Sequence, residues 1–81
     1  MPWRVLAHGD QVWHVDAIAE RPANTVAWQL ALSFRAAAER PRGRAFWTRY
    51  PLEATSKTSL FIQAERIPNT ALCKLLAQRL A

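Results

Sequence analysis

In the segment Val26-Ala27-Trp28-Gln29-Leu30-Ala31-Leu32-Ser33-Phe34-Arg35-Ala36, large apolar residues alternate with small or polar ones. Successive side chains of a β-strand point to opposite faces of a sheet, so this stretch would have one continuous apolar face. In a helix the same apolar side chains would be scattered around the circumference. We therefore predict a long central strand over residues 25–36.

Two earlier segments, residues 3–7 and 11–20, show the same alternation and predict two further strands. Large aromatic side chains are expected on the buried face, so Trp3 and Trp13 should lie on the same side of the sheet. Val5, two residues after Trp3 in the strand, should then lie on that side as well. In an antiparallel pair this arrangement puts Val5 opposite Trp13 and requires a loop with an odd number of residues, most simply the three residues 8–10.

The segment between the second and third predicted strands, residues 21–24, contains a proline and an asparagine and breaks the alternation. A four-residue loop here would place Glu20 opposite Thr25. The three strands would then form an antiparallel meander with a single apolar inner face. This predicted inner face carries Trp3, Val5, Trp13, Val15, Ala17, Trp28, Leu30, Leu32 and Phe34.

A fourth, short strand is predicted over residues 45–50, which are rich in aromatic and β-branched side chains. Pro51 follows it and favours an extended conformation for the preceding residue. Both Phe46 and Trp47 are bulky, so the sequence leaves open which of them faces the core.

The last third of the chain has helical spacing of its apolar residues. We predict a helix over residues 57–67, ended by Pro68, although a strand over residues 59–67 also fits the alternation there. A second amphipathic helix is predicted over residues 69–80. The expected fold class is therefore α+β: a three- to four-stranded antiparallel meander packed by one or two C-terminal helices.

The chain of 81 residues is expected to form a single domain, and 51% hydrophobic residues with four tryptophans favour a packed core over disorder. It has no apolar run long enough to span a bilayer and a single cysteine, Cys73. We therefore expect a cytoplasmic protein that has no contact with a membrane and needs no cofactor.

The formal net charge is +5, and an arginine-rich segment with interleaved aromatic residues follows the central strand. Guanidinium groups bind phosphates and aromatic rings stack on bases in single-stranded nucleic acid. Nucleic acid is thus one predicted partner, and an acidic protein is another. Alternatively, nine of the eleven basic residues are arginine, which a compositional bias toward arginine also produces. The candidate nucleic-acid-binding residues are Arg40, Arg42, Arg44, Trp47, Arg49 and Tyr50.

A second hypothesis concerns the opposite face of the predicted sheet, which is unusually rich in small and apolar residues for a face in contact with water. Apolar patches of this kind mark interaction sites. The chain would then be a protein-interaction module, or a homo-oligomer, that uses this face. The candidate interaction residues are Leu6, Val12, Ile18, Ala27, Ala31 and Ser33.

Catalytic and metal sites are not expected. His8, His14 and Asp16 lie close together in the sequence, but their spacing matches no metal-ligand pattern. Cys73 falls in the predicted terminal helix, where a buried or half-buried thiol is ordinary. The two glycines are too far apart for a phosphate-binding loop. We therefore predict a non-enzymatic binding protein.

Overall fold

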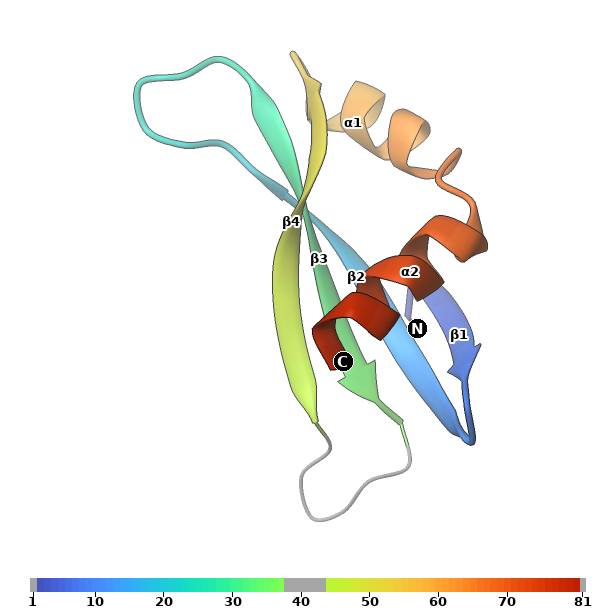
Figure 1. Cartoon of the computed structure of the whole chain (residues 1–81). Helices are drawn as coiled ribbons and strands as arrows, with labels where there is room; N and C mark the ends of the chain where they lie inside the picture. Colours follow the sequence, from blue (N-terminus) through green and yellow to red (C-terminus); the bar gives the residue numbers. More distant parts are fainter. Residues whose placement is uncertain (1, 38–43, 81) are drawn as a thin grey trace.

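The computed structural model describes residues 2–37 and 44–80 of the chain. Within these residues the chain forms a four-stranded antiparallel sheet in the order β1-β2-β3-β4, followed by two helices that pack on it (Figure 1). The predicted α+β meander is thus confirmed. The elements are β1 Arg4–His8, β2 Gln11–Glu20, β3 Trp28–Ala36, β4 Ala45–Ala54, α1 Lys57–Ala64 and α2 Asn69–Leu80.

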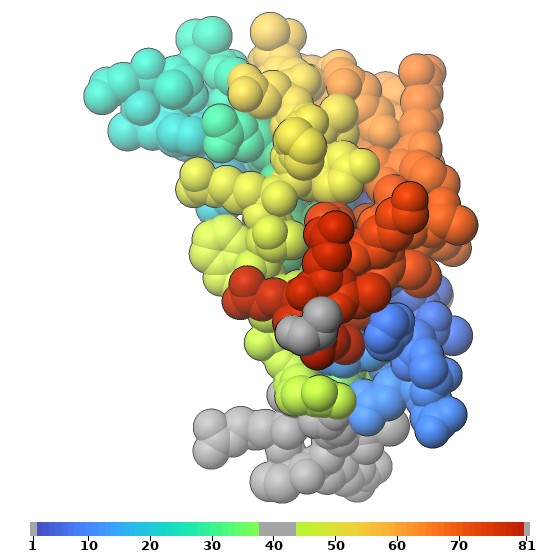
Figure 2. Space-filling view, viewed as in Figure 1, coloured from blue at the N-terminus to red at the C-terminus, as the bar shows by residue number. Residues whose placement is uncertain are grey.

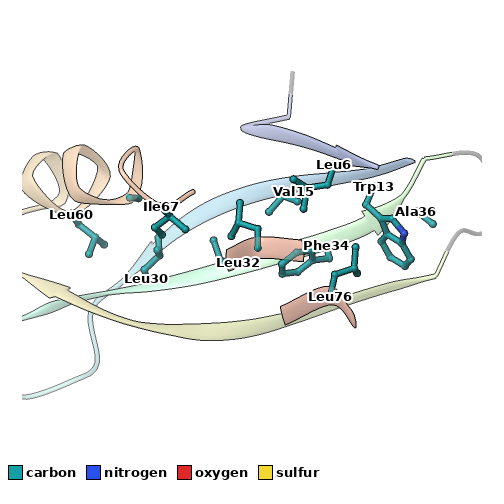
Figure 3. Packing of buried hydrophobic residues seen from close by; sticks show 12 residues of the cluster. Leu6, Trp13, Val15, Leu30, Leu32, Phe34, Ala36, Leu60, Ile67 and Leu76 are labelled. Carbon is teal, nitrogen blue, oxygen red and sulfur yellow. The ribbon is translucent and has the colours of Figure 1, made fainter. Parts of the chain in front are cut away.

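The core lies between the helices and one face of the sheet, which we call the inner face (Figure 3). Trp13 of β2 and Phe34 of β3 are fully buried there, as the alternation predicts. The ring of Phe34 stacks on that of Phe46 in β4, with centroids 4.9 Å apart, so Phe46 is the member of the Phe46–Trp47 pair that faces the core. The buried cluster comprises Leu6, Trp13, Val15, Leu30, Leu32, Phe34, Ala36, Leu60, Ala64, Ile67, Leu72 and Leu76.

The predicted pairing of β1 with β2 is wrong by one residue. Leu6, not Val5, lies opposite Trp13, and His8 pairs with Gln11. The reason is the turn: Gly9 has φ +60°, which allows a two-residue hairpin in place of the expected three-residue loop. A one-residue slip exchanges the faces of a strand, so Leu6 is 2% exposed in the core whereas Val5 is 55% exposed on the other face.

The connection from β2 to β3 is longer than predicted. Residues 22–25 form a tight turn in which the Thr25 amide donates to the Pro22 carbonyl at 3.3 Å and Asn24 has φ +66°. This turn keeps Val26 out of the sheet, where it is 79% exposed. Glu20 consequently pairs with Gln29 and not with Thr25. The shift is four residues, an even number, so the predicted faces of β2 and β3 are retained.

β4 continues past the expected end at residue 50. Leu30 pairs with Tyr50 but Gln29 pairs with Glu53, so β4 has a bulge that contains Pro51. A proline cannot donate to a ladder hydrogen bond, and edge strands and bulges are the places in a sheet that tolerate it. The edge position of β4 therefore explains why Pro51 does not end the strand.

Residues 57–64 are helical, as favoured over the strand alternative. Ser56 caps the helix by accepting a hydrogen bond from the Ser59 amide at 3.1 Å. α1 ends at Ala64, three residues earlier than predicted, and the chain turns before Pro68. α2 has the predicted bounds, with Leu72 and Leu76 buried.

Arg4 joins the first strand to the turn between the two helices. It lies opposite Val15 and therefore on the inner side of the sheet. Its guanidinium donates hydrogen bonds to the backbone oxygens of Glu65 (3.0 Å) and Ile67 (2.7 Å). A third bond, of 2.8 Å, reaches Oδ1 of Asn69. No local pattern in the sequence indicates this role, because the hydrogen-bond partners of Arg4 lie more than sixty residues further along the chain.

The prediction placed Trp3 on the inner face by strand alternation, but Trp3 precedes β1 and is not part of a strand. It is half-buried at the margin of the core. Its amide donates to Oδ1 of Asp16 at 3.2 Å, and its indole Nε1 donates to Oε1 of Glu65 at 3.0 Å. Trp3 therefore contributes to the attachment of the helices, beside Arg4.

Candidate interaction face

Both helices cover the inner face, and the opposite face of the sheet, which we call the outer face, has no described element packed on it (Figure 1). The pairing of the strands aligns its side chains in rows across the sheet. One row places Asp16, Ser33 and Trp47 side by side, and the next places Ile18, Ala31 and Arg49. The outer face consists of Val5, Ala7, Val12, His14, Asp16, Ile18, Glu20, Gln29, Ala31, Ser33, Arg35, Ala45, Trp47, Arg49 and Glu53.

Trp47 is the largest exposed apolar side chain of this face, with 58% of its surface accessible. The ring borders a shallow hollow of about 190 Å³ that is also lined by Ile18, Glu20, Ala31 and Ser33. Small side chains on β3 form its floor, and Ala31 is almost completely buried by its neighbours. The sheet thus has an apolar depression with an aromatic wall, open to solvent.

Only some of the predicted interaction residues lie on the outer face. Val12, Ile18, Ala31 and Ser33 lie on it. Leu6 does not, because the slip of β1 places it in the core. Ala27 precedes β3 and lies outside the strands. Val5 also lies on this face, although the predicted register of β1 placed it in the core. Trp47, whose side the sequence left open, lies on it as well.

The predicted nucleic-acid-binding set is divided by the structure. Arg40 and Arg42 lie outside the described residues. Trp47 and Arg49 share the outer face, but Tyr50 has the opposite orientation and packs half-buried against the core. Arg44 lies on the inner side as well, with its guanidinium 5.8 Å from the centre of the Trp13 ring. Among the described members, only Trp47 and Arg49 could contact one ligand together on the outer face.

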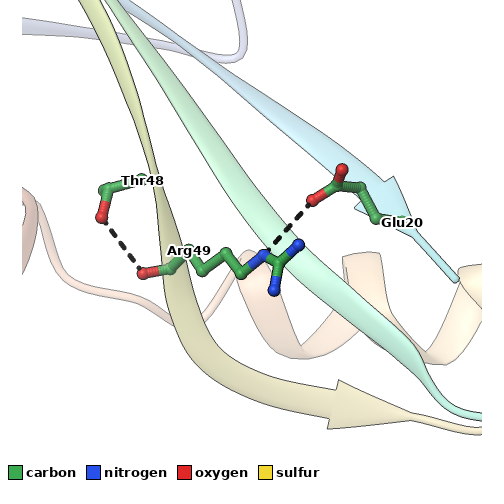
Figure 4. A network of polar contacts seen from close by, with 3 residues as sticks. All are labelled: Glu20, Thr48 and Arg49. Atoms are coloured by element: carbon green, nitrogen blue, oxygen red, sulfur yellow. Dashed lines mark hydrogen bonds and ion pairs between the residues drawn. The ribbon is translucent and has the colours of Figure 1, made fainter. Parts of the chain in front are cut away.

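The outer face carries charges of both signs. Arg49 reaches across β3 toward Glu20 on β2, with 3.9 Å between Nε and Oε1 (Figure 4). The described arginines of this face are Arg35 and Arg49, against the acidic residues Asp16, Glu20 and Glu53. The positive net charge of the chain is therefore not concentrated on this face.

Several of the remaining cations lie near other parts of the molecule. Arg21 and Lys57 both approach the ring of Trp28, at 5.3 and 5.2 Å from its centre. Arg79 of α2 lies 5.1 Å from the centre of the Phe46 ring. These cations cover aromatic rings at the margins of the core, an arrangement in which the long side chains also shield apolar surface.

The inner side has a second open hollow, between β4 and α2, of about 210 Å³. It is lined by Phe46, Thr48, Leu75, Gln78 and Arg79. Figure 2 shows α2 (red) beside β4 (yellow-green) on this side of the molecule, with part of α2 reaching over the strand. This lining mixes apolar and polar side chains with one cation, Arg79, and among the described residues it includes no nucleophile with an adjacent base.

The residues considered for metal binding are not brought together. His14 and Asp16 share the outer face, whereas His8 points to the other side of the sheet. Cys73 is half-buried on α2. Across residues 2–37 and 44–80, no group of three or more His, Cys, Asp or Glu side chains is placed to hold a metal ion.

The fold and the outer face together define a small α+β protein with an open sheet surface. A scan against protein-family models, a search of curated proteins and a search of solved structures each found no match. Neither helix in the described part of the chain has the length and apolar character needed to cross a membrane.

Proposed function

We propose that this protein is a non-enzymatic interaction module that binds another protein through the outer face of its sheet. The single observation that carries the proposal is the cluster of Trp47 and Ile18 around an open hollow on a face that the helices leave uncovered. A soluble sheet with one face in water normally presents mainly polar side chains there, and contiguous exposed apolar groups mark binding surfaces.

The composition of the face fits a protein partner better than a polyanion. Tryptophan and arginine are the residues most enriched among those that dominate protein–protein binding energy, and Trp47 and Arg49 lie in adjacent rows here. The acidic residues Asp16, Glu20 and Glu53 would repel phosphates but can pair with basic groups of a protein. The proposed partner therefore has an apolar surface with charges of both signs, and the proposed location is the cytoplasm.

Nucleic acid is the second candidate. It is favoured by one observation, which is that Trp47 offers an exposed ring for stacking between two arginines of the same face, Arg35 and Arg49. The described acidic residues on this face weigh against it, as does the separation of Arg44 and Tyr50 from Trp47.

The two candidates are separated by in-cell photo-crosslinking. A photoreactive amino acid at Ile18, 44% exposed on the outer face, is expected to form an adduct with a protein. The matched control is the same amino acid at Ile62, exposed on α1. Purified partner should then bind the chain, and Ile18→Lys should weaken this binding by about tenfold or more, because a charge replaces a buried apolar contact.

Adducts that are sensitive to nuclease and not to protease would favour the nucleic-acid candidate. Identical adducts from positions 18 and 62, or none from position 18, would contradict a specific role of the outer face. Circular dichroism of each variant establishes that the sheet is intact.

A further inference from the structure

β4 is an outermost strand of the sheet, and the direction of its backbone groups follows from one hydrogen bond. The Ala36 amide donates to the carbonyl of residue 44 at 2.9 Å, which makes positions 36 and 44 a hydrogen-bonded pair. Such pairs alternate along an antiparallel ladder. The N–H and C=O groups of Ala45, Trp47 and Arg49 therefore point away from β3, along the free edge of the sheet.

Edge strands are usually protected against pairing with another chain by proline, bulges, lysine or a covering element. In β4 the bulge and Pro51 provide this protection only toward its end. The segment from Ala45 to Arg49 contains no proline, no lysine and no bulge. The charged side chain of Arg49 does not guard the edge either, because it extends over β3 toward Glu20 (Figure 4).

The outward backbone groups have little to satisfy them within the described chain. The Arg49 carbonyl accepts a hydrogen bond from Oγ1 of Thr48, but at 3.5 Å, a long distance for this type of bond. The unprotected stretch from Ala45 to Arg49 thus has outward backbone groups at every second residue, and Trp47 is at its centre.

We propose that β4 pairs antiparallel with β4 of a second copy of this chain, with the two-fold axis at Trp47. Trp47 then lies opposite its own equivalent and Ala45 lies opposite Arg49 of the second copy. In each opposed pair the two residues exchange two hydrogen bonds. The two sheets become one continuous sheet.

This register uses every outward position of the unprotected stretch. A shift of two residues toward the end of β4 would bring Pro51, which has no N–H, opposite Ala45. In the register centred on Trp47 each Arg49 faces an alanine, so no like charges oppose each other directly, a condition for self-pairing. The two Trp47 residues become direct cross-strand neighbours at the axis, and the outer faces of the two copies join on the same side of the sheet.

The proposal stands independently of the partner of the outer face, because it depends on backbone groups at the edge. Its test is the oligomeric state of the purified chain by sedimentation velocity over a range of concentrations up to millimolar. We expect a reversible dimer. Ala45→Pro removes an outward N–H without removing a bond to β3 and should weaken dimerisation by at least about tenfold.

The matched control is Ala7→Pro. Ala7 is an exposed alanine of β1, the opposite edge strand, and its N–H also points away from the sheet, because its neighbours Leu6 and His8 form the hydrogen-bonded pairs with β2. This variant should dimerise like the original chain.

A chain that stays monomeric at millimolar concentration overturns the proposal. So does a dimer that both proline variants weaken equally. If Ala45→Pro fails to fold, isotope-filtered NMR of the mixed-label original chain decides instead, since the register predicts a contact between the Hα atoms of Phe46 and Thr48 of different copies. Absence of that contact in a dimer overturns the proposed pairing.

Discussion

Phe34→Ala is expected to lower the free energy of unfolding by about 3–5 kcal/mol. The side chain is fully buried, stacks on Phe46 and lies on the central strand, so its removal leaves a cavity that the surrounding core cannot close. A chain of this length has a total stability of only about 4–12 kcal/mol. Urea denaturation followed by circular dichroism should therefore show a large decrease in the unfolding midpoint, or a chain that is partly unfolded in buffer.

The control for this prediction is Val26→Ala. Val26 and Phe34 belong to the same apolar alternation of the sequence, but the structure places Val26 in an exposed loop. Its change should alter stability by less than about 0.5 kcal/mol. An equally large loss of stability from Val26→Ala would indicate that Val26 is buried in the sheet. This result would contradict the turn at residues 22–25, which places Val26 outside β3.

The second large effect is expected at Arg4. Arg4→Met keeps most of the apolar length of the side chain but removes the guanidinium, which donates to two backbone carbonyls and to Asn69. These acceptors in the turn between α1 and α2 would lose a charged donor, and we expect the free energy of unfolding to fall by about 2–3 kcal/mol. Arg4→Lys should recover only part of it, because an ammonium group cannot reproduce the fork of the guanidinium.

Urea denaturation also measures this effect, and Arg35→Met is the matched control. Arg35 is an exposed arginine in the middle of the sheet, on the outer face, so its loss should change stability by less than about 0.5 kcal/mol. The loss at Arg4 should persist at high salt, since the acceptors are neutral. Equal destabilisation by the two substitutions would contradict the attachment of the helices through Arg4.

The residues that alternate strictly were sufficient to predict the strands and most of the core. Phe34, Leu32 and Trp13 are buried where the pattern places them, because the side-chain period of a strand holds along its whole length. Pairing depends on the turns, which the pattern does not determine. Because of the turn at Gly9, the register of β1 differs from the predicted one by one residue, and its two faces are exchanged. The longer connection after β2 changes the register of β3 by four residues, which leaves its faces as predicted.

The candidate site was harder to predict than the fold. Whether Phe46 or Trp47 faces solvent depends on how β4 pairs with β3, and both side chains are equally suited to a core. The contribution of Arg4 depends on a turn more than sixty residues away. Arg49 of the outer face has an acidic neighbour, Glu20, that is far from it in the sequence, so the charge balance of the face becomes visible only when the strands are aligned.

The sheet has one face covered by the helices and one open face, with Trp13 and Trp47 on opposite sides. Hydroxyl-radical footprinting with mass spectrometry can distinguish the two faces, on protein diluted below the concentration at which any dimer forms. We predict rapid oxidation of Trp47 and protection of Trp13, which is fully buried. Protection of both rings in the dilute, folded chain, or rapid oxidation of both, would contradict the assignment of the open face.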